Sequence, residues 1–122
     1  MLVAAALQAA LAFNLACTGT EQAGPLGLVL PGAPASFAIT YRIDLDLNLW
    51  CSDACERTET IGSVVFGHIL LRDRSVPSGR HVIDFDPATG RLTDTLTDGN
   101  RQVLRHGTCT RQEFSGFPNV SA

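Results

Sequence analysis

The sequence predicts an all-β fold, a small antiparallel meander of about five to seven strands that closes as an open barrel or sandwich. An N-terminal apolar signal helix is expected to precede it. Three observations favour this fold. Large apolar residues alternate with polar or small ones from Phe37 to Leu49, Gly- and Pro-containing turns separate the later segments, and four cysteines stand in only 122 residues. A chain of this length accommodates one domain, which we place at residues 36–122.

The segment 1–16, MLVAAALQAALAFNLA, is almost entirely apolar. It is short for a membrane-spanning helix, which needs about 20 apolar residues. It fits a signal peptide, with Ala10-Leu11-Ala12 as a small-x-small cleavage site. The alternative is a buried N-terminal helix of the domain. Because Arg42 is the first basic residue, the positively charged leader of a normal export signal is missing, and a start upstream of Met1 would account for this.

Residues 17–35 are rich in Gly, Pro and small side chains and are predicted to form a linker, with Leu28-Val29-Leu30 as a short edge strand. The domain then opens on the alternating segment 37–49. Only an extended strand turns such a period of two into one apolar and one wet face. We therefore predict a single long strand over 37–49.

The chain then turns through Trp50, Cys51 and Cys55. The next segment, 61–71, is short, rich in β-branched residues and apolar at both parities. This composition predicts a buried central strand. A helix is the alternative, because periodicity alone does not separate the two.

The segment 80–109 predicts a three-stranded meander, with turns at 86–90 and at Gly99-Asn100. A two-residue loop at Gly99-Asn100 fixes the pairing of the two strands that flank it. It sets Leu96 opposite Val103 and Asp94 opposite Arg105. Apolar and opposite-charge pairs of this kind stabilise a strand register.

The C-terminal segment carries two aromatic residues, Phe114 and Phe117, around Gly116. We expect it to plug one end of the core. Asn119-Val120-Ser121 matches a glycosylation sequon, which has meaning only in a eukaryotic secreted protein.

An even number of cysteines in a short exported chain indicates disulfides and an oxidising compartment, so the protein is expected to be periplasmic or secreted. Four cysteines allow three pairings. We favour Cys51–Cys55 as a local loop and Cys17–Cys109 as a long-range bridge, and the crossed pairings remain open. A lesser alternative is lipidation of Cys17, whose preceding Asn14-Leu15-Ala16 resembles a lipobox only at the Ala.

The net charge is −3, with nine basic and twelve acidic residues. No large basic surface follows from this balance, so nucleic acid is excluded as an expected partner. Membrane contact is expected only through a signal peptide or a lipid on Cys17. No cofactor signature stands in the chain, and no cofactor is predicted.

Two groups of residues are weak candidates for chemistry. Cys51 and Cys55 could bind a metal or act as a thiol redox pair, although a structural disulfide is the favoured interpretation. His81 and His106 could lie on neighbouring strands near Asp84 and Asp86 and serve as metal ligands or as a base. No nucleophile accompanies them, and no local metal motif links them to His68, so we assign no catalytic and no metal residue.

The segment Asp44-Leu45-Asp46-Leu47-Asn48 resembles the first half of a calcium loop. Leu49 stands where such a loop needs Gly, and Cys55 stands where it needs Glu. We therefore interpret these polar residues as the solvated face of a strand.

Several short motifs carry a family resemblance, namely Tyr41-Arg42-Ile43-Asp44-Leu45, Trp50-Cys51, Cys55, Gly107-Thr108-Cys109 and Phe114-Ser115-Gly116-Phe117-Pro118. With them the chain resembles a family of small exported alphaproteobacterial proteins of unknown function. The resemblance covers most of the chain after Ser36. It implies a periplasmic or outer-surface location and supplies no activity.

Together these features predict a disulfide-stabilised envelope or periplasmic domain that binds a partner or serves a structural role without catalysis. Its expected partner is an unknown envelope protein or a small ligand. The alternative is a small periplasmic metal-binding or thiol redox protein that uses Cys51 and Cys55. A second alternative is a small hydrolase-like enzyme with a histidine base.

Overall fold

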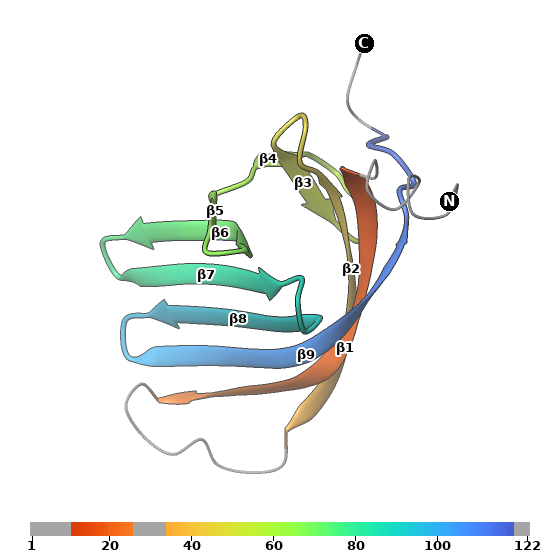
Figure 1. Cartoon of the computed structure of the whole chain (residues 1–122). Helices are drawn as coiled ribbons and strands as arrows, with labels where there is room; N and C mark the ends of the chain where they lie inside the picture. The colour runs from red at the N-terminus through yellow and green to blue at the C-terminus, as the bar shows by residue number, and fades with distance from the viewer. Residues whose placement is uncertain (1–10, 26–33, 119–122) are drawn as a thin grey trace.

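The computed structural model describes residues 11–25 and 34–118. These residues form one antiparallel sheet in the order β4-β3-β2-β1-β9-β8-β7-β6-β5, which curls into an open half-barrel (Figure 1). The nine strands of the described part are β1 (Ala12–Pro25), β2 (Ala35–Asp44), β3 (Leu49–Ser52), β4 (Glu59–Thr60), β5 (Ser63–Val65), β6 (His68–Val76), β7 (Gly79–Asp86), β8 (Arg91–Asp98) and β9 (Arg101–Glu113). The predicted all-β class is confirmed.

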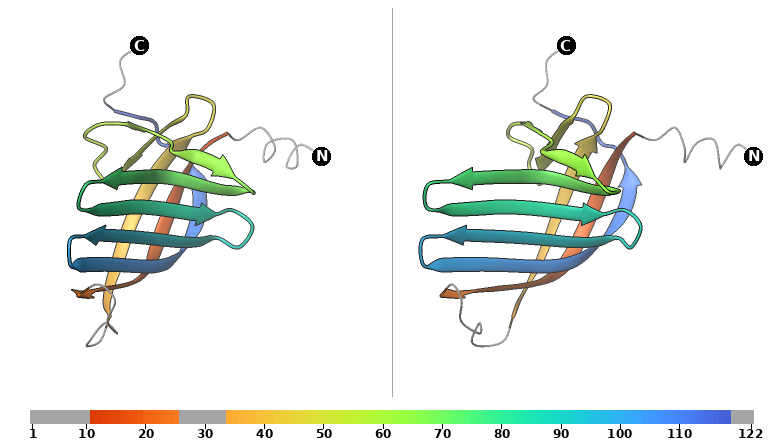
Figure 2. Two further views of the ribbon diagram at one scale, coloured as in Figure 1. Left: turned by 90° about the vertical axis from the view of Figure 1, so that its left-hand side faces the viewer. Right: turned by 60° about the vertical axis from the view of Figure 1, so that its left-hand side comes forward.

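Two orientations in Figure 2 show how the half-barrel is built. Strands β6 to β9 lie one above another as a flat stack, and β1 and β2 cross behind them. The long strand β9 lies between these two groups and pairs with β8 along one edge and with β1 along the other. No helix in the described ranges has the length and apolarity needed to span a membrane.

Strand β1 corrects the expected boundaries at the N-terminal end. Residues 17–25 are not a linker but the larger part of a central strand that pairs with β2 on one side and β9 on the other. Residues 12–16, assigned above to a signal peptide, begin the same strand, and Phe13 and Leu15 are buried in the core. Segments 1–10 and 26–33, with the expected signal helix and the edge strand at Leu28, lie outside the described residues.

The alternation that begins at Phe37 forms a strand only as far as Asp44. There the side-chain Oδ1 of Asp44 accepts hydrogen bonds from the backbone N–H groups of Asp46 and Leu47, both at 3.0 Å. Asn48 adopts a left-handed φ of 61°, and the chain returns as β3. Local side-chain capping thus competes with strand extension, so the prediction of one strand to Leu49 is wrong.

The segment 61–71 is also not a buried central strand. It contains a tight hairpin in which Val65 pairs with His68, and Phe66 and Gly67 form the loop with φ of 51° and 81°. Two positive φ values fit the type I′ geometry that matches strand twist. The outcome is an edge strand, β5, with Phe66 99% exposed at its tip.

The predicted meander and its register are confirmed. Leu96 pairs with Val103 and Asp94 with Arg105 across β8 and β9, and β7 pairs with β8 along its whole length. The turn before β8 forms as expected, since the Asp86 Oδ1 accepts from the Ala88 N–H at 2.9 Å and Gly90 adopts a φ of 77°.

Both favoured disulfides are present. Cys17 and Cys109 face each other in the β1–β9 ladder with their Cα atoms 4.0 Å apart, and Cys51 and Cys55 close a short loop after β3. The bridge to Cys109 engages the Cys17 sulfur that lipidation would need free. The disulfides indicate an oxidising, extracellular-type environment.

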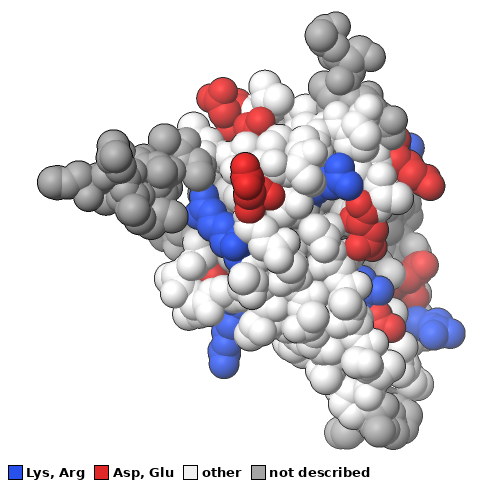
Figure 3. All heavy atoms as spheres, turned by 90° about the vertical axis from the view of Figure 1, so that its right-hand side faces the viewer, with Lys and Arg blue, Asp and Glu red and all other residues white. Residues whose placement is uncertain are grey.

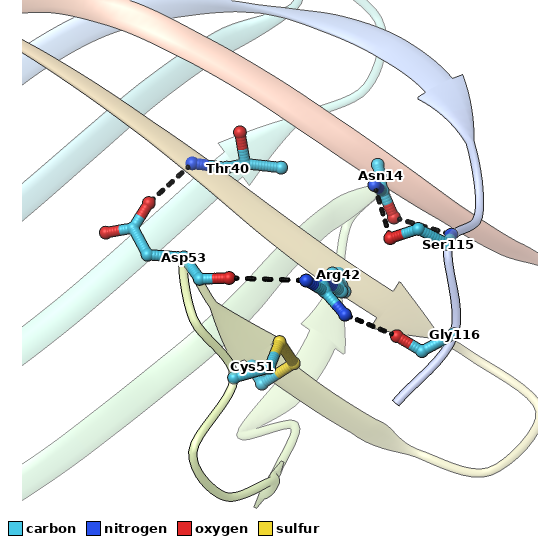
Figure 4. Close-up of a disulfide and its surroundings, with 8 residues drawn as sticks. Asn14, Thr40, Arg42, Cys51, Asp53, Ser115 and Gly116 are labelled. Atoms are coloured by element: carbon cyan, nitrogen blue, oxygen red, sulfur yellow. Dashed lines mark hydrogen bonds between the residues drawn. A yellow bond between two sulfur atoms is a disulfide. The ribbon is translucent and has the colours of Figure 1, made fainter. Parts of the chain in front are cut away.

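The C-terminal tail is held by polar contacts beside the Cys51–Cys55 bridge (Figure 4). The Asn14 amide and Ser115 exchange two hydrogen bonds, and Arg42 Nη1 donates to the Gly116 carbonyl at 3.0 Å. Phe114 and Phe117 pack edge to face against each other with centroids 5.0 Å apart and are only half-buried. The expected aromatic plug is therefore wrong.

The core lies on one face of the sheet, called here the inner face. Its buried members come from six strands and one connecting segment, and include Phe13, Leu15, Tyr41, Ile43, Trp50, Ile61, Ile69, Leu71, Ile83, Phe85 and Leu92. On the face shown in Figure 3, acidic and basic side chains are interspersed and neither sign forms a continuous patch.

Candidate binding site at the seam of the half-barrel

A row of charged and polar side chains crosses the inner face above the core. We call it the polar row, and its members are Glu21, Arg105, Asp94, His81, Arg72 and Glu59. Strand alternation places the first four on the inner face, because they share the parity of buried neighbours such as Leu15, Leu92 and Ile83. The row therefore runs from β1 through β9, β8 and β7 to β6, and ends at Glu59 on the edge strand β4.

Consecutive members of the polar row are in contact. Arg105 Nε donates to Glu21 Oε1, and its Nη1 lies 3.6 Å from Asp94 Oδ2. His81 Nε2 lies 2.7 Å from Asp94 Oδ1, and Arg72 Nη1 lies 3.1 Å from His81 Nδ1. At the far end Arg72 Nη2 donates to Glu59 Oε2. The hydrogen bond that Arg105 donates to Glu21 keeps the pKa of Arg105 above its ordinary value.

A bulge in β6 brings Arg72 into this row. The β6–β7 register shifts between Leu70 and Arg72, so Arg72 pairs with Ile83. Without the extra residue Arg72 would pair with Val82 and point to the outer face. Bulges re-aim side chains in this way and occur preferentially beside functional sites.

The surroundings of His81 do not suit a general base. A guanidinium can only donate, so the contact from Arg72 assigns the lone pair of the ring to Nδ1 and the hydrogen to Nε2. That hydrogen is donated to the carboxylate of Asp94, whose side chain is only 9% exposed. Both nitrogens are thus engaged within the protein.

The expected grouping of His81 and His106 near Asp84 and Asp86 does not form. His81 lies on β7 and the exposed His106 on β9, with β8 between them, and strand alternation puts His106 on the outer face. Asp84 and Asp86 instead accompany His68, whose Nδ1 lies 2.8 Å from Asp84 Oδ1 and whose Nε2 lies 3.7 Å from Asp86 Oδ2. The hydrogen bond to Asp84 raises the pKa of His68.

The expected cysteine site is closed by a bond. Cys51 and Cys55 are both about 2% exposed and are joined to each other, and no cysteine in the described ranges is free. Among residues 11–25 and 34–118, no three His, Cys, Asp or Glu side chains are arranged to hold a metal ion. Metal or thiol chemistry at this pair would require the disulfide to be reduced first.

In the part of the chain that the structure describes, three hydrogen-bond donors near the polar row are buried without an acceptor: Tyr41 Oη, Trp50 Nε1 and Arg72 Nε. Tyr41 and Trp50 are 1% and 2% exposed, and their ring centroids lie 5.9 Å apart. The Arg72 guanidinium carbon lies 5.2 Å from the Trp50 ring centroid. Burial, aided by the charge of Asp94, raises the pKa of Tyr41, so its hydroxyl keeps its proton and can donate.

The two ends of the sheet approach each other beside these donors. We call this place the seam. Across it the Gly62 N–H donates to the Leu71 carbonyl at 3.2 Å, and Glu59 pairs with Arg72 and, at 3.5 Å, with Arg74. A groove of about 330 Å³ opens here, lined by Thr58, Glu59, Thr60, Gly62, Leu71, Arg72, Asp73 and Arg74. Arg72 belongs both to this groove and to the buried donor group.

Sequence reasoning finds only part of this site. The pair Asp94–Arg105 follows from the predicted hairpin register, and His81 is among the candidate residues. Arg72, Glu59, Tyr41 and Trp50 are missed. The available signal is an arginine directly after an apolar segment, together with the only Tyr and the only Trp of the chain.

Comparison with protein-family models, with curated proteins and with solved structures gives no match for this chain. The site is therefore interpreted from its own geometry.

Proposed function

We propose that this chain is a disulfide-stabilised, non-catalytic binding domain of the periplasm or the extracellular space, and that it takes a small ligand at the seam. The location is supported by the two disulfides, which need an oxidising compartment to persist. A signal cleavage after Ala12 is compatible with this proposal, because the buried part of β1 begins at Phe13.

The three buried donors without acceptors support the binding role. A buried polar group left unsatisfied costs about 1–3 kcal/mol. The summed cost of three such groups is a substantial fraction of the free energy of unfolding of a small domain. A ligand with hydrogen-bond acceptors would offset that cost on binding. The engaged nitrogens of His81 argue against a histidine-base hydrolase, and the buried Cys51–Cys55 bridge argues against a thiol redox protein.

The proposal is tested by a thermal-shift screen of small carboxylates, amides, sugars and amines. A ligand present at a hundred times its Kd stabilises by about 2.7 kcal/mol, a shift on the order of 10 °C for a domain of this size. We expect acceptor-bearing compounds to raise the Tm and simple amines not to. Arg72→Gln is expected to abolish the shift, whereas Arg91→Gln, which removes an exposed arginine on the outer face of β8, is expected to preserve it.

Absence of a shift with every class of compound would contradict ligand binding at the seam. Location is tested separately, by the intact mass of the protein from its native source. Four thiols that appear only after reduction are expected. Free thiols at Cys51 and Cys55 would contradict the structural role of that bridge.

A further inference from the structure

We infer that the anchoring group of the seam ligand is a carboxylate, which displaces Glu59 from Arg72 and is received by Tyr41 Oη and Trp50 Nε1. This inference rests on the binding function proposed above and names the ligand class for that site.

The chemistry of the three unpaired donors points to an anionic ligand group. An indole N–H and a guanidinium N–H only donate, and the Tyr41 hydroxyl is protonated, so all three buried groups seek acceptors. One of them carries a positive charge. A carboxylate supplies several acceptor sites and the opposite charge, and hydrogen bonds between charged partners are the stronger kind. An amine ligand would leave all three donors unpaired.

The protein already places a carboxylate at this point. Glu59 comes from β4, at one edge of the sheet, and reaches Arg72 on β6 across the seam. Its side chain is 27% exposed, and its second oxygen lies 3.5 Å from the largely exposed Arg74. Glu59 thus occupies the position that a ligand carboxylate would take and competes with that carboxylate for Arg72.

Access to the buried donors runs through Arg72. Arg72 lines the groove and its guanidinium carbon lies 5.2 Å from the Trp50 ring centroid, whereas the Tyr41 hydroxyl and the Trp50 indole N–H are buried. A carboxylate that enters the groove meets Arg72 first. Release of Glu59 from Arg72 then opens the way to the two deeper donors, while Arg72 keeps its contact with His81. The groove volume of about 330 Å³ is at the lower end of ligand pockets, which suits a small molecule.

The test uses octanoate and butyrate as probes, with octanamide and octylamine as neutral and cationic counterparts at matched ionic strength. Trp50 is the only tryptophan, so its fluorescence reports directly on the site. Octanoate is expected to give a saturable change in emission that octylamine does not give. Glu59→Gln keeps the shape of the side chain and removes the competing charge, so it is expected to tighten octanoate binding several-fold.

Tyr41→Phe removes one donor and is expected to weaken octanoate binding about tenfold, the effect of one hydrogen bond to a charged group. Trp50→Phe, followed by calorimetry, is expected to act similarly. If Tyr41→Phe does not fold, Glu59→Gln decides the matter alone, because that residue lies at the surface of the groove.

The outcomes separate the two proposals. Tighter binding to Glu59→Gln supports the carboxylate assignment. The carboxylate assignment is overturned if octanoate binding depends on Arg72 but is unchanged in Glu59→Gln, Tyr41→Phe and Trp50→Phe. In that case the seam is still a binding site. Equal binding of octanamide and octanoate also overturns it. Absence of binding by any probe or screened compound overturns both.

Discussion

The two disulfides should differ sharply in what they contribute to stability. In the chain-entropy model, a cross-link stabilises by closing a loop in the unfolded chain, and the effect grows with the logarithm of loop length. The Cys17–Cys109 bridge spans a sequence separation of 92, and the Cys51–Cys55 bridge spans 4. At 25 °C these spans correspond to about 4.6 and about 1.9 kcal/mol.

The native states of the two variants should be comparable. All three of Cys17, Cys51 and Cys55 are at most 2% exposed, so replacement by alanine leaves a small buried space in either case. The ladder between β1 and β9 also positions Cys17 opposite Cys109 without help from the bridge. The difference of about 2.7 kcal/mol therefore comes mainly from the unfolded state.

The assay is urea unfolding of Cys17→Ala/Cys109→Ala and of Cys51→Ala/Cys55→Ala, followed by Trp50 fluorescence. We expect the first double variant to lose the larger free energy of unfolding and to show a higher m-value, because its unfolded chain is less compact. If removal of the Cys51–Cys55 bridge destabilises as much or more, the loop-entropy reasoning is refuted.

Three further predictions concern single positions. Gly19→Ala should destabilise by about 1–3 kcal/mol or more, because a Cβ there would lie 2.0 Å from the His106 carbonyl oxygen of the neighbouring strand; a urea midpoint equal to that of the wild type would contradict this contact. Phe66→Asn should stabilise by roughly 0.5–1 kcal/mol, since Asn tolerates the φ of 51° and the fully exposed Phe66 makes little packing contribution; a lower Tm would count against it. Asp84→Asn should bring the pKa of His68 down towards its ordinary value, measured by NMR titration of the ring protons. Because the folded-state pKa is raised, the His68–Asp84 pair stabilises fully below about pH 6.5 and loses its effect as pH rises through the raised pKa; an unchanged titration midpoint would show that Asp84 is not the cause.

The parts of the fold that depend on local signals are predictable from the sequence. The register of β8 and β9 follows from the short Gly99-Asn100 loop, since a two-residue turn leaves one way to pair the flanking strands. The turn at 86–90 follows from its Asp, Pro and Gly. The alternation from Phe37 identifies β2, although its end is set by the side chain of Asp44.

The parts of the fold that depend on partners distant in the sequence cannot be predicted in this way. Strand β1 is obscured by the apolar segment before it and by its Gly and Ala content, and its partners β2 and β9 are fixed only by the fold. The hairpin at Phe66 places an aromatic residue in a conformation that favours Gly or Asn. Likewise the seam depends on the curl of the whole sheet and on the bulge that turns Arg72 inward, neither of which has a sequence signature.

The position of β1 beside β9 has a consequence for the order of folding. Strands β1 to β4, and β5 to β9, each pair with neighbours in sequence, whereas the contact that joins these two groups links the beginning of the described chain to its end. Forming such a long-range contact requires the closure of a long loop, and its entropy cost is offset only when the contact is complete. The contact therefore slows folding. The two hairpin arrays can form early, but the centre of the sheet cannot close until all of β9 is available. Until then, the long edges of β1 and β9 are unpaired and open to association with other chains. Oxidation of Cys17 and Cys109 would then follow the pairing of β1 with β9. The disulfide that contributes most to stability therefore forms only after the last step of folding.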